Sequence, residues 1–285
     1  MRLAIHTPIV VRMPHSHATW EESAGIAELA EIARAGDRLG YDHMTCAEHV
    51  AVPVPVTAIR GGTYWDPLAT FGYLAAHTER IRFATNVLVL GYHHPLEIAK
   101  RYGTLDVVSG GRLILGLGVG SLQEEFELLG ASFADRGARG DDALRALRAS
   151  LSQREPAYRG TYYAYEGFVV DPCALQPRVP LWIGGRTLRS LRRAVALADG
   201  WVPFALKTAD IAGMLAKLER PAGFEVILDA DRRMDPTGEP AQALDTLAAL
   251  ARAGVTIAYA TVVQRSLAHY LEQLEALQRV NTQLD

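Results

Sequence analysis

Short runs of apolar and β-branched residues alternate with longer segments of helical periodicity along the chain, and eight strand–helix units can be counted. Such alternation predicts parallel strands, because the helix of each unit returns the chain to the same end of the sheet. Eight units in 285 residues are typical of a closed (β/α)8 barrel. An open doubly wound sheet is the competing architecture, but it usually has fewer units or a second domain. The sequence therefore predicts an α/β fold, a (β/α)8 TIM barrel.

The predicted barrel forms a single domain over residues 1–285. Its first helix is expected to begin at Thr19 as N-cap, with Glu21 and Glu22 in the first turn. An aromatic, glycine-bounded segment predicts a hairpin excursion near 155–172. The predicted strands are 3–6, 42–46, 81–86, 112–117, 181–183, 201–204, 224–228 and 255–260. The later predicted helices are 67–77, 95–108, 123–129, 138–151, 188–198, 209–218, 241–253 and 267–280.

Composition excludes several classes of function. The formal net charge is only −3, with both signs spread along the chain, so nothing favours nucleic acid or an anionic membrane as partner. No apolar run approaches the length of a membrane span, and the N-terminus does not resemble a signal peptide. Cys46 and Cys173 are too few for a disulfide scaffold. A small-molecule substrate and a reducing cytoplasm are expected.

In a barrel of this kind, chemistry collects at the carboxyl ends of the strands. Glu48 and His49 follow the second predicted strand, and this carboxylate–imidazole pair could perform acid–base chemistry. Tyr92 and His93 follow the third. Metal binding would need about three convergent ligands, but the spacing of these residues does not support it, and no metal is predicted.

Two glycine-rich segments follow later strands. Gly116-Leu117-Gly118-Val119-Gly120 would let a ligand approach the backbone closely, although a tight turn would use the same residues. Its place in the chain does not match a dinucleotide-binding fingerprint. Ile183-Gly184-Gly185-Arg186-Thr187 runs from a strand into a helix, where free amides beside Arg186 would bind an anion. A plain helix cap, with Thr187 or Ser190 satisfying the amides, is the alternative.

Together these segments resemble the luciferase-like monooxygenase and deazaflavin oxidoreductase superfamily. The most specific stretch, 81–130, contains I-R-F-A-T-N-V-L-V-L, H-P-L-E-I-A-K, T-L-D-V-V-S-G-G-R-L-I-L-G-L-G-V-G and E-E-F-E-L-L-G. A second stretch, 177–201, contains P-x-x-P-L-W-I-G-G and R-R-A-V-A-L-A-D-G-W. Two shorter segments, E-H at 48–49 and Y-W-D-P-L at 64–68, also fit the superfamily. The resemblance spans residues 1–205 and is more specific to the superfamily than to one activity.

The resemblance implies roles for these positions. Asn86-Val87, with Thr85 before them, would carry a non-prolyl cis peptide bond behind the flavin ring, and His49 would lie near the ring with Glu48 beside it. The cofactor phosphate would lie against the glycine loops, and four residues after other strands would line the substrate pocket. The implied phosphate site comprises Gly118, Val119, Gly120, Gly184, Gly185 and Arg186, and the implied pocket comprises His6, Tyr92, His93 and Phe204.

The pattern is closest to members that use coenzyme F420, which predicts hydride transfer to or from a small organic substrate. An FMN-dependent two-component monooxygenase, fed by a partner flavin reductase, is the first alternative. A barrel that binds a flavin or deazaflavin without catalysis is the second. Ser121 stands where sugar-phosphate dehydrogenase relatives have an acid, which argues against that reaction by the same mechanism. A homodimer remains open as the assembly.

Overall fold

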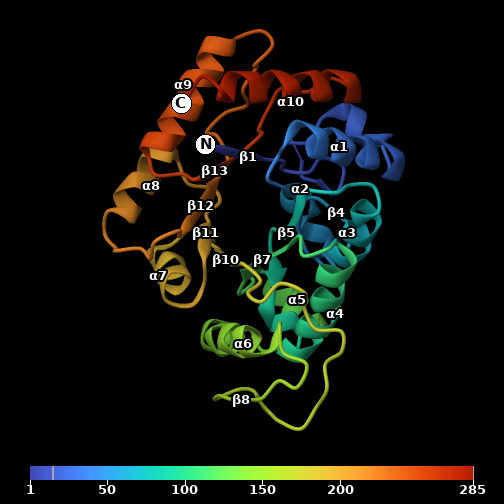
Figure 1. The fold of residues 1–285 in the computed structure, drawn as a ribbon, viewed down its shortest axis with the longest axis vertical. Helices are drawn as coiled ribbons and strands as arrows, with labels where there is room; N and C mark the ends of the chain where they lie inside the picture. The colour runs from blue at the N-terminus through green and yellow to red at the C-terminus, as the bar shows by residue number, and fades with distance from the viewer. Residues whose placement is uncertain (15, 285) are drawn as a thin grey trace.

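Eight parallel strands form the barrel (Figure 1). The computed structural model describes residues 1–14 and 16–284. The order around the barrel is β1-β13-β12-β11-β10-β7-β5-β3, and a parallel bridge between Ile5 and Met44 joins β1 to β3. The (β/α)8 prediction is therefore confirmed. The strands are β1 Arg2–Ala4, β3 His43–Cys46, β5 Arg82–Thr85, β7 Leu113–Gly118, β10 Leu181–Gly184, β11 Gly200–Val202, β12 Glu225–Leu228 and β13 Ile257–Tyr259.

Helices surround this ring of strands (Figure 1). The main helices are α1 Ile26–Leu39, α3 Pro67–Ala75, α4 Pro95–Val108, α5 Gln123–Leu128, α6 Arg136–Ser150, α7 Leu188–Leu197, α8 Thr208–Leu215, α9 Pro240–Arg252 and α10 Leu267–Asn281. Shorter elements are η1 Thr19–Glu22, η2 Val54–Val56, α2 Thr57–Arg60, η3 Leu90–Tyr92, and strands β2 Val11–Arg12, β4 Thr63–Tyr64 and β6 Leu88–Val89. The segment 155–172 contains the antiparallel hairpin β8 Tyr158–Arg159 and β9 Ala164–Tyr165.

The predicted start of the first helix is wrong. Thr19 begins the separate 3-10 helix η1, and α1 begins at Ile26 after Gly25. The reason lies in Glu21, whose carboxylate is buried and accepts hydrogen bonds from the amides of Ile9 and Ala18 (2.8 and 2.7 Å). Glu21 therefore fixes the loop after β1 and belongs to η1, not to α1. Glu28 caps α1 instead, by accepting from Gly25 N at 2.8 Å.

The core has two parts, as the alternation of side chains along each strand requires. One part fills the barrel interior: Ala4, Ala84, Ile114, Trp182, Val202, Ile227, Ile257 and Tyr259. The larger part lies between the strands and the surrounding helices and includes Ile5, Met44, Leu117 and Leu228. The alternation therefore identifies which residue at each strand end faces the barrel axis.

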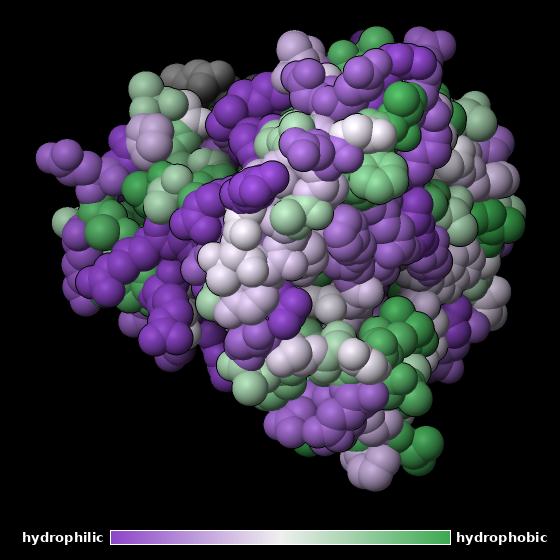
Figure 2. All heavy atoms as spheres, turned by 90° about the horizontal axis from the view of Figure 1, so that it is seen from below, coloured by the Kyte–Doolittle hydropathy of each residue, from purple (hydrophilic) through white to green (hydrophobic). Residues whose placement is uncertain are grey.

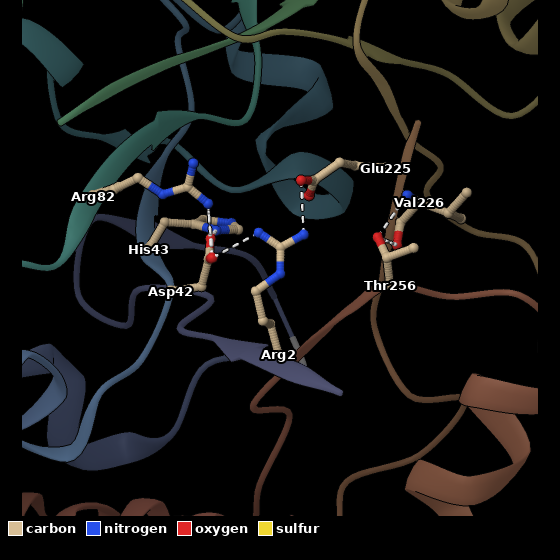
Figure 3. Close-up of polar contacts among 7 residues, drawn as sticks. All are labelled: Arg2, Asp42, His43, Arg82, Glu225, Val226 and Thr256. Atoms are coloured by element: carbon tan, nitrogen blue, oxygen red, sulfur yellow. Dashed lines mark hydrogen bonds and ion pairs between the residues drawn. The ribbon is translucent and has the colours of Figure 1, made fainter. Parts of the chain in front are cut away.

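Ion pairs join the amino ends of the strands (Figure 3). The Asp42 carboxylate contacts Arg82 at 2.6 Å and Arg2 at 3.1 Å, and Arg2 also reaches Glu225 at 2.7 Å. His43 Nδ1 lies 2.7 Å from Asp42 Oδ1. Burial alone would raise the pKa of Asp42, but the hydrogen bond from His43 and the charge of Arg82 outweigh it and hold that pKa well below its usual value.

The outer surface near α6 is predominantly polar. Figure 2 views the molecule from the end where α6 and the β8–β9 hairpin lie, and hydrophilic residues cover most of this face with smaller apolar groups between them. Among residues 1–14 and 16–284, no helix combines the length and apolar composition that a membrane crossing requires.

Candidate active site

The carboxyl ends of the strands form the mouth of the barrel, and its two halves differ. Side chains two residues beyond an interior residue face the axis again. On β10 this position is Gly184, two residues after Trp182, and on β7 it is Gly118, four residues after Ile114; neither has a side chain. On β1, β12 and β13 they are His6, Asp229 and Thr261. The mouth thus has a glycine half and, across the barrel, a polar half.

The glycine half is built around Val87. The peptide bond between Asn86 and Val87 is cis, as the resemblance implied. A Cβ atom on Gly118 would lie 2.6 Å from one methyl group of Val87, and a Cβ on Gly184 would lie 2.7 Å from the other. Both glycines are therefore needed for the Val87 side chain to pack between β7 and β10. Thr85 fixes the strand beneath by donating from its hydroxyl to Gly116 O at 2.7 Å.

The loop after β7 offers backbone donors at this half of the mouth. Gly120 has φ +78°, which favours glycine, and Arg136 Nε donates to its carbonyl at 3.3 Å. The amides of Val119 and Gly120 donate to no other backbone group of the part that the structure describes. These amides are suited to an anionic ligand group.

The start of α7 satisfies some of its own amides, as the helix-cap alternative anticipated. Thr187 Oγ1 accepts from Ser190 N and Ser190 Oγ accepts from Thr187 N, each at 3.2 Å. Gly185 N donates to Val202 O at 3.3 Å. The Arg186 side chain is exposed, and its amide donates to no described backbone group. Of the predicted residues Gly185 and Arg186, only Arg186 therefore has an amide free for a ligand.

Glu48 and His49 lie beside the cis peptide but face different partners. Glu48 N donates to Val87 O at 3.2 Å. The Glu48 carboxylate contacts His93 Nε2 at 2.7 Å and accepts from Val89 N at 2.8 Å. It is nearly buried and ties β6 and the following turn to the end of β3.

Glu125 on α5 is the residue that the sequence interpretation missed. Its Oε2 lies 2.6 Å from His49 Nδ1 and accepts from the Tyr92 hydroxyl at 2.8 Å. Its Oε1 accepts from the amides of Val50 and Ala51 at 2.6 and 3.1 Å. Burial raises the pKa of Glu125, but the hydrogen bonds from His49 and Tyr92 lower it by a larger amount, so the net shift of the pKa is downward. The E-E-F-E-L-L-G stretch was its only signal.

The predicted pocket residues have different contacts. Tyr92 and His93 are held by Glu125 and Glu48, on the side of the mouth where His49 lies. His6 pairs with Asp229, with 3.3 Å between His6 Nδ1 and Asp229 Oδ1. Phe204 follows β11 and is 54% exposed. Ser121 accepts from Arg60 at 3.3 Å.

The barrel and its mouth define a class of enzyme fold with the chemistry at the strand ends, and comparison with known proteins names the family. The profile described as luciferase-like monooxygenase matches residues 1–223. The chain therefore belongs to the luciferase-like monooxygenase family. The superfamily interpretation made from the sequence motifs is confirmed.

Its curated relatives include enzymes of two kinds. An uncharacterised protein of Mycobacterium tuberculosis (strain ATCC 25618 / H37Rv) is 30% identical over 201 residues, 66% of this chain and 69% of the relative. The 4-hydroxyprotoasukamycin monooxygenase of Streptomyces nodosus subsp. asukaensis is 34% identical over 131 residues, 46% of this chain and 33% of that enzyme. The F420-dependent glucose-6-phosphate dehydrogenase of Microbacterium testaceum (strain StLB037) is 27% identical over 194 residues, 67% and 56% of the two chains.

Solved structures share the fold over nearly the whole chain. The monooxygenase RslO1 from Streptomyces bottropensis superposes with a TM-score of 0.75 at 19% identity, covering 98% of both chains. The coenzyme F420 dependent tetrahydromethanopterin reductase from Methanopyrus kandleri gives a TM-score of 0.74 at 14% identity, again covering 98% of both chains. At such identities the likeness is one of fold.

Proposed function

We propose that this protein is an oxidoreductase that uses coenzyme F420 to transfer hydride to or from a small organic substrate. One observation carries the proposal: the Glu48 amide donates a hydrogen bond to Val87 O at 3.2 Å. The Glu48-His49 dipeptide therefore lies directly beside the cis Asn86-Val87 peptide. The resemblance implies that the reactive ring lies against this peptide, so the His49 imidazole would be near the ring. The 27% identical F420-dependent dehydrogenase supports the choice of cofactor.

The residues present fit such a cofactor. The amides of Val119, Gly120 and Arg186 would hold its phosphate, because they have no backbone acceptor among the described residues. Val87 would support one face of the ring. Bound there, the deazaflavin would supply the carbon that gives or takes hydride.

His49 is prepared for a role beside the ring. Its Nδ1 is fixed by Glu125 at 2.6 Å, and its ring meets Tyr64 edge-on with centroids 4.5 Å apart. Nε2 is therefore the imidazole atom left to face a ligand. We assign it a proton relay or the positioning of the ring, with Glu125 as the carboxylate that supports the imidazole.

An FMN-dependent monooxygenase is the second candidate, favoured by the 34% identity to a monooxygenase over 131 residues. The two cofactors differ in chemistry, since reduced FMN activates oxygen whereas a deazaflavin reacts with it poorly. Titration of the purified protein with F420 and with FMN, in both redox states, separates the candidates. Tighter binding of FMN, with oxygen consumption when a flavin reductase is added, would contradict the proposal.

Binding of F420 without turnover of any substrate would indicate a barrel that carries the cofactor without catalysis. If turnover is found, variants of His49 and Glu48 distinguish a proton relay from the positioning of the ring. A lost proton relay in His49→Ala should lower the single-turnover rate by about 10²–10⁴-fold at unchanged cofactor affinity. A positioning role should weaken cofactor binding as well. If His49→Ala or Glu48→Gln leaves both the cofactor affinity and the single-turnover rate within about twofold of the wild type, under roughly 0.5 kcal/mol, the substituted residue has no part in the mechanism.

A further inference from the structure

A second histidine–carboxylate pair lies at the mouth, on the half opposite the glycines. His6 follows β1, Asp229 follows β12 and Thr261 follows β13, and these three strands are neighbours in the barrel. His6 Nδ1 lies 3.3 Å from Asp229 Oδ1, and the Thr261 hydroxyl donates to the same oxygen at 3.0 Å. The carboxylate is thus oriented by Thr261 and holds one nitrogen of the imidazole.

Strand periodicity places this pair over the barrel axis. Ala4, Ile227 and Tyr259 belong to the interior cluster, and the residue two positions after each faces the same way. The Tyr259 ring lies under His6, with centroids 5.4 Å apart, and its side chain is buried. His6 therefore rests on the barrel core and can open only toward the mouth.

His6 keeps a free position there, unlike His49 and His93. Its side chain is 52% exposed, compared with 16% for His49 and 11% for His93. Nδ1 is engaged with Asp229, and Nε2 has no hydrogen-bond partner among the residues described. An imidazole oriented by a carboxylate through one nitrogen, with the other nitrogen free of a hydrogen-bond partner, is the arrangement of a general acid–base.

Position in the ring relates the pair to the proposed cofactor site. In the order β1-β13-β12-β11-β10-β7-β5-β3, β10 stands opposite β1, β7 opposite β13, and β5 opposite β12. The glycine half, with Val87 and the free amides after β7 and β10, therefore faces His6 and Asp229 across the mouth. A substrate between the two halves would touch the cofactor on one side and His6 on the other.

We propose that the proton that accompanies hydride transfer is exchanged between the substrate and His6, oriented by Asp229. Of the two roles open to His49, this leaves the positioning of the ring. The inference rests on the proposed function, which supplies the reductant. In the reducing direction, hydride and its electron pair bond to a substrate carbon, the π pair of its double bond moves to the attached heteroatom, and that atom takes the proton from Nε2. The N–H electron pair stays on the neutral imidazole, and solvent restores the proton. In the oxidising direction, neutral Nε2 accepts the proton.

The charges around His6 are compatible with this role. Burial lowers the pKa of His6, but the charge of Asp229 and its hydrogen bond raise it, and the net shift is upward. Glu21, from the loop after β1, acts in the same direction, whereas Arg233, from the loop after β12, opposes it. Tyr259 beneath carries no charge because burial raises its pKa well above the usual value.

The pairing can be tested on the protein alone. NMR titration of histidine-labelled protein, with His6 assigned from His6→Gln, should show a lower His6 pKa in Asp229→Asn than in the wild type. The control is His77→Gln, which removes an imidazole on the outside of the barrel, near Arg34, and should leave the His6 titration unchanged. An identical His6 titration with and without Asp229 would overturn the proposal, whatever cofactor the protein uses.

The catalytic role is tested with the loaded enzyme. His6→Gln should slow single turnover by at least about 10²-fold and remove one limb of the pH–rate profile, while F420 affinity stays within twofold of the wild type. Asp229→Asn should slow it less and shift that limb to lower pH. A His6→Gln rate and profile equal to those of His77→Gln would refute the inference. Failure of the wild type to bind F420 would instead contradict the proposed function. The NMR titration would still decide whether Asp229 and His6 act as a pair.

Discussion

The two ends of the barrel each hold an aspartate beside a histidine, and burial gives the two pairs opposite properties. At the amino end, Asp42 and His43 lie 2.7 Å apart and His43 is fully buried. At the mouth, His6 and Asp229 lie 3.3 Å apart and are 52% and 38% exposed. The Tyr259 ring lies between them, with its centroid 5.6 Å from His43 and 5.4 Å from His6.

The pKa of the histidine follows from this difference. Burial lowers the pKa of His43, and the hydrogen bond and charge of Asp42 do not offset it. For His6, Asp229 outweighs burial and the pKa rises. Asp42 also serves Arg2 and Arg82, whereas Asp229 serves one imidazole and one hydroxyl. The same two residue types therefore stabilise the fold at one end and are available for chemistry at the other.

The largest effect on stability is expected at the amino end. Asp42→Asn removes the charge that pairs with Arg2 and Arg82, and the free energy of unfolding should fall by about 3 kcal/mol. This is the low end for a broken buried pair, because the arginine side chains are 46% and 28% exposed. Urea denaturation measures the change. F420 affinity should not change, because the proposed site is at the other end of the barrel.

The matched control is a surface pair. Glu275 and Arg279 are 2.9 Å apart on α10 and are both more than half exposed, so Glu275→Gln should cost no more than about 0.5 kcal/mol. If Asp42→Asn costs as little as Glu275→Gln, the amino end is not stabilised by its ion pairs and the comparison fails.

A smaller effect is expected at the glycine half of the mouth. A Cβ on Gly184 would lie 2.7 Å from Val87 Cγ1, so Gly184→Ala should displace Val87 and weaken F420 binding at least about tenfold, roughly 1.4 kcal/mol. Gly185 is a poorer target because its φ of +144° and the 2.6 Å approach to Ser190 would also disturb the fold. Fluorescence titration of the folded variant gives the dissociation constant.

Gly213→Ala is the control, because a Cβ at this position in α8 meets no atom within 4 Å. It should bind F420 as the wild type does and be more stable by about 0.5–1 kcal/mol, since alanine is the better helix former. Wild-type affinity in a folded Gly184→Ala variant would show that Val87 does not support the cofactor.

The smallest effect is a difference between the two pairs in the pH dependence of stability. The lowered pKa of Asp42 gives stability that is present above the unfolded value of about 4 and is lost as the pH falls through the folded pKa. The raised pKa of His6 gives stability that is present below the unfolded value of about 6.5 and is lost as the pH rises through the folded pKa. Solvent screening keeps the His6 contribution small.

Thermal melts from pH 3 to 9 therefore sharpen the comparison. The stability difference between wild type and Asp42→Asn should shrink only toward acid pH. That between wild type and Asp229→Asn should shrink toward alkaline pH, as His6 loses its proton, and also at the acid end, because the pKa of Asp229 is lowered as well. Parallel curves for the two variants would contradict the distinction drawn between the two ends.

Local patterns in the sequence determined the elements of this protein. The helix predicted over 95–108 is α4, with the same bounds, and all eight barrel strands lie at or within two residues of the predicted runs. Periodicity and capping act within a few residues, so a short window contains the information. The exception was the start of α1, where Glu21 bonds to Ile9 across 12 residues and overrides the local helix signal at Thr19.

The pairings at the mouth were decided by the tertiary structure. The sequence motifs identified Glu48, His49 and the glycine loops, whose roles stay predictions, but the carboxylate they suggested beside His49 was Glu48 and not Glu125. His49 finds Glu125 across 76 residues, and His6 finds Asp229 across 223. Both contacts exist only because the strands close into a ring that brings their ends to one mouth. Burial then separates Asp42–His43 from Asp229–His6, because exposure depends on what covers a residue in the closed barrel.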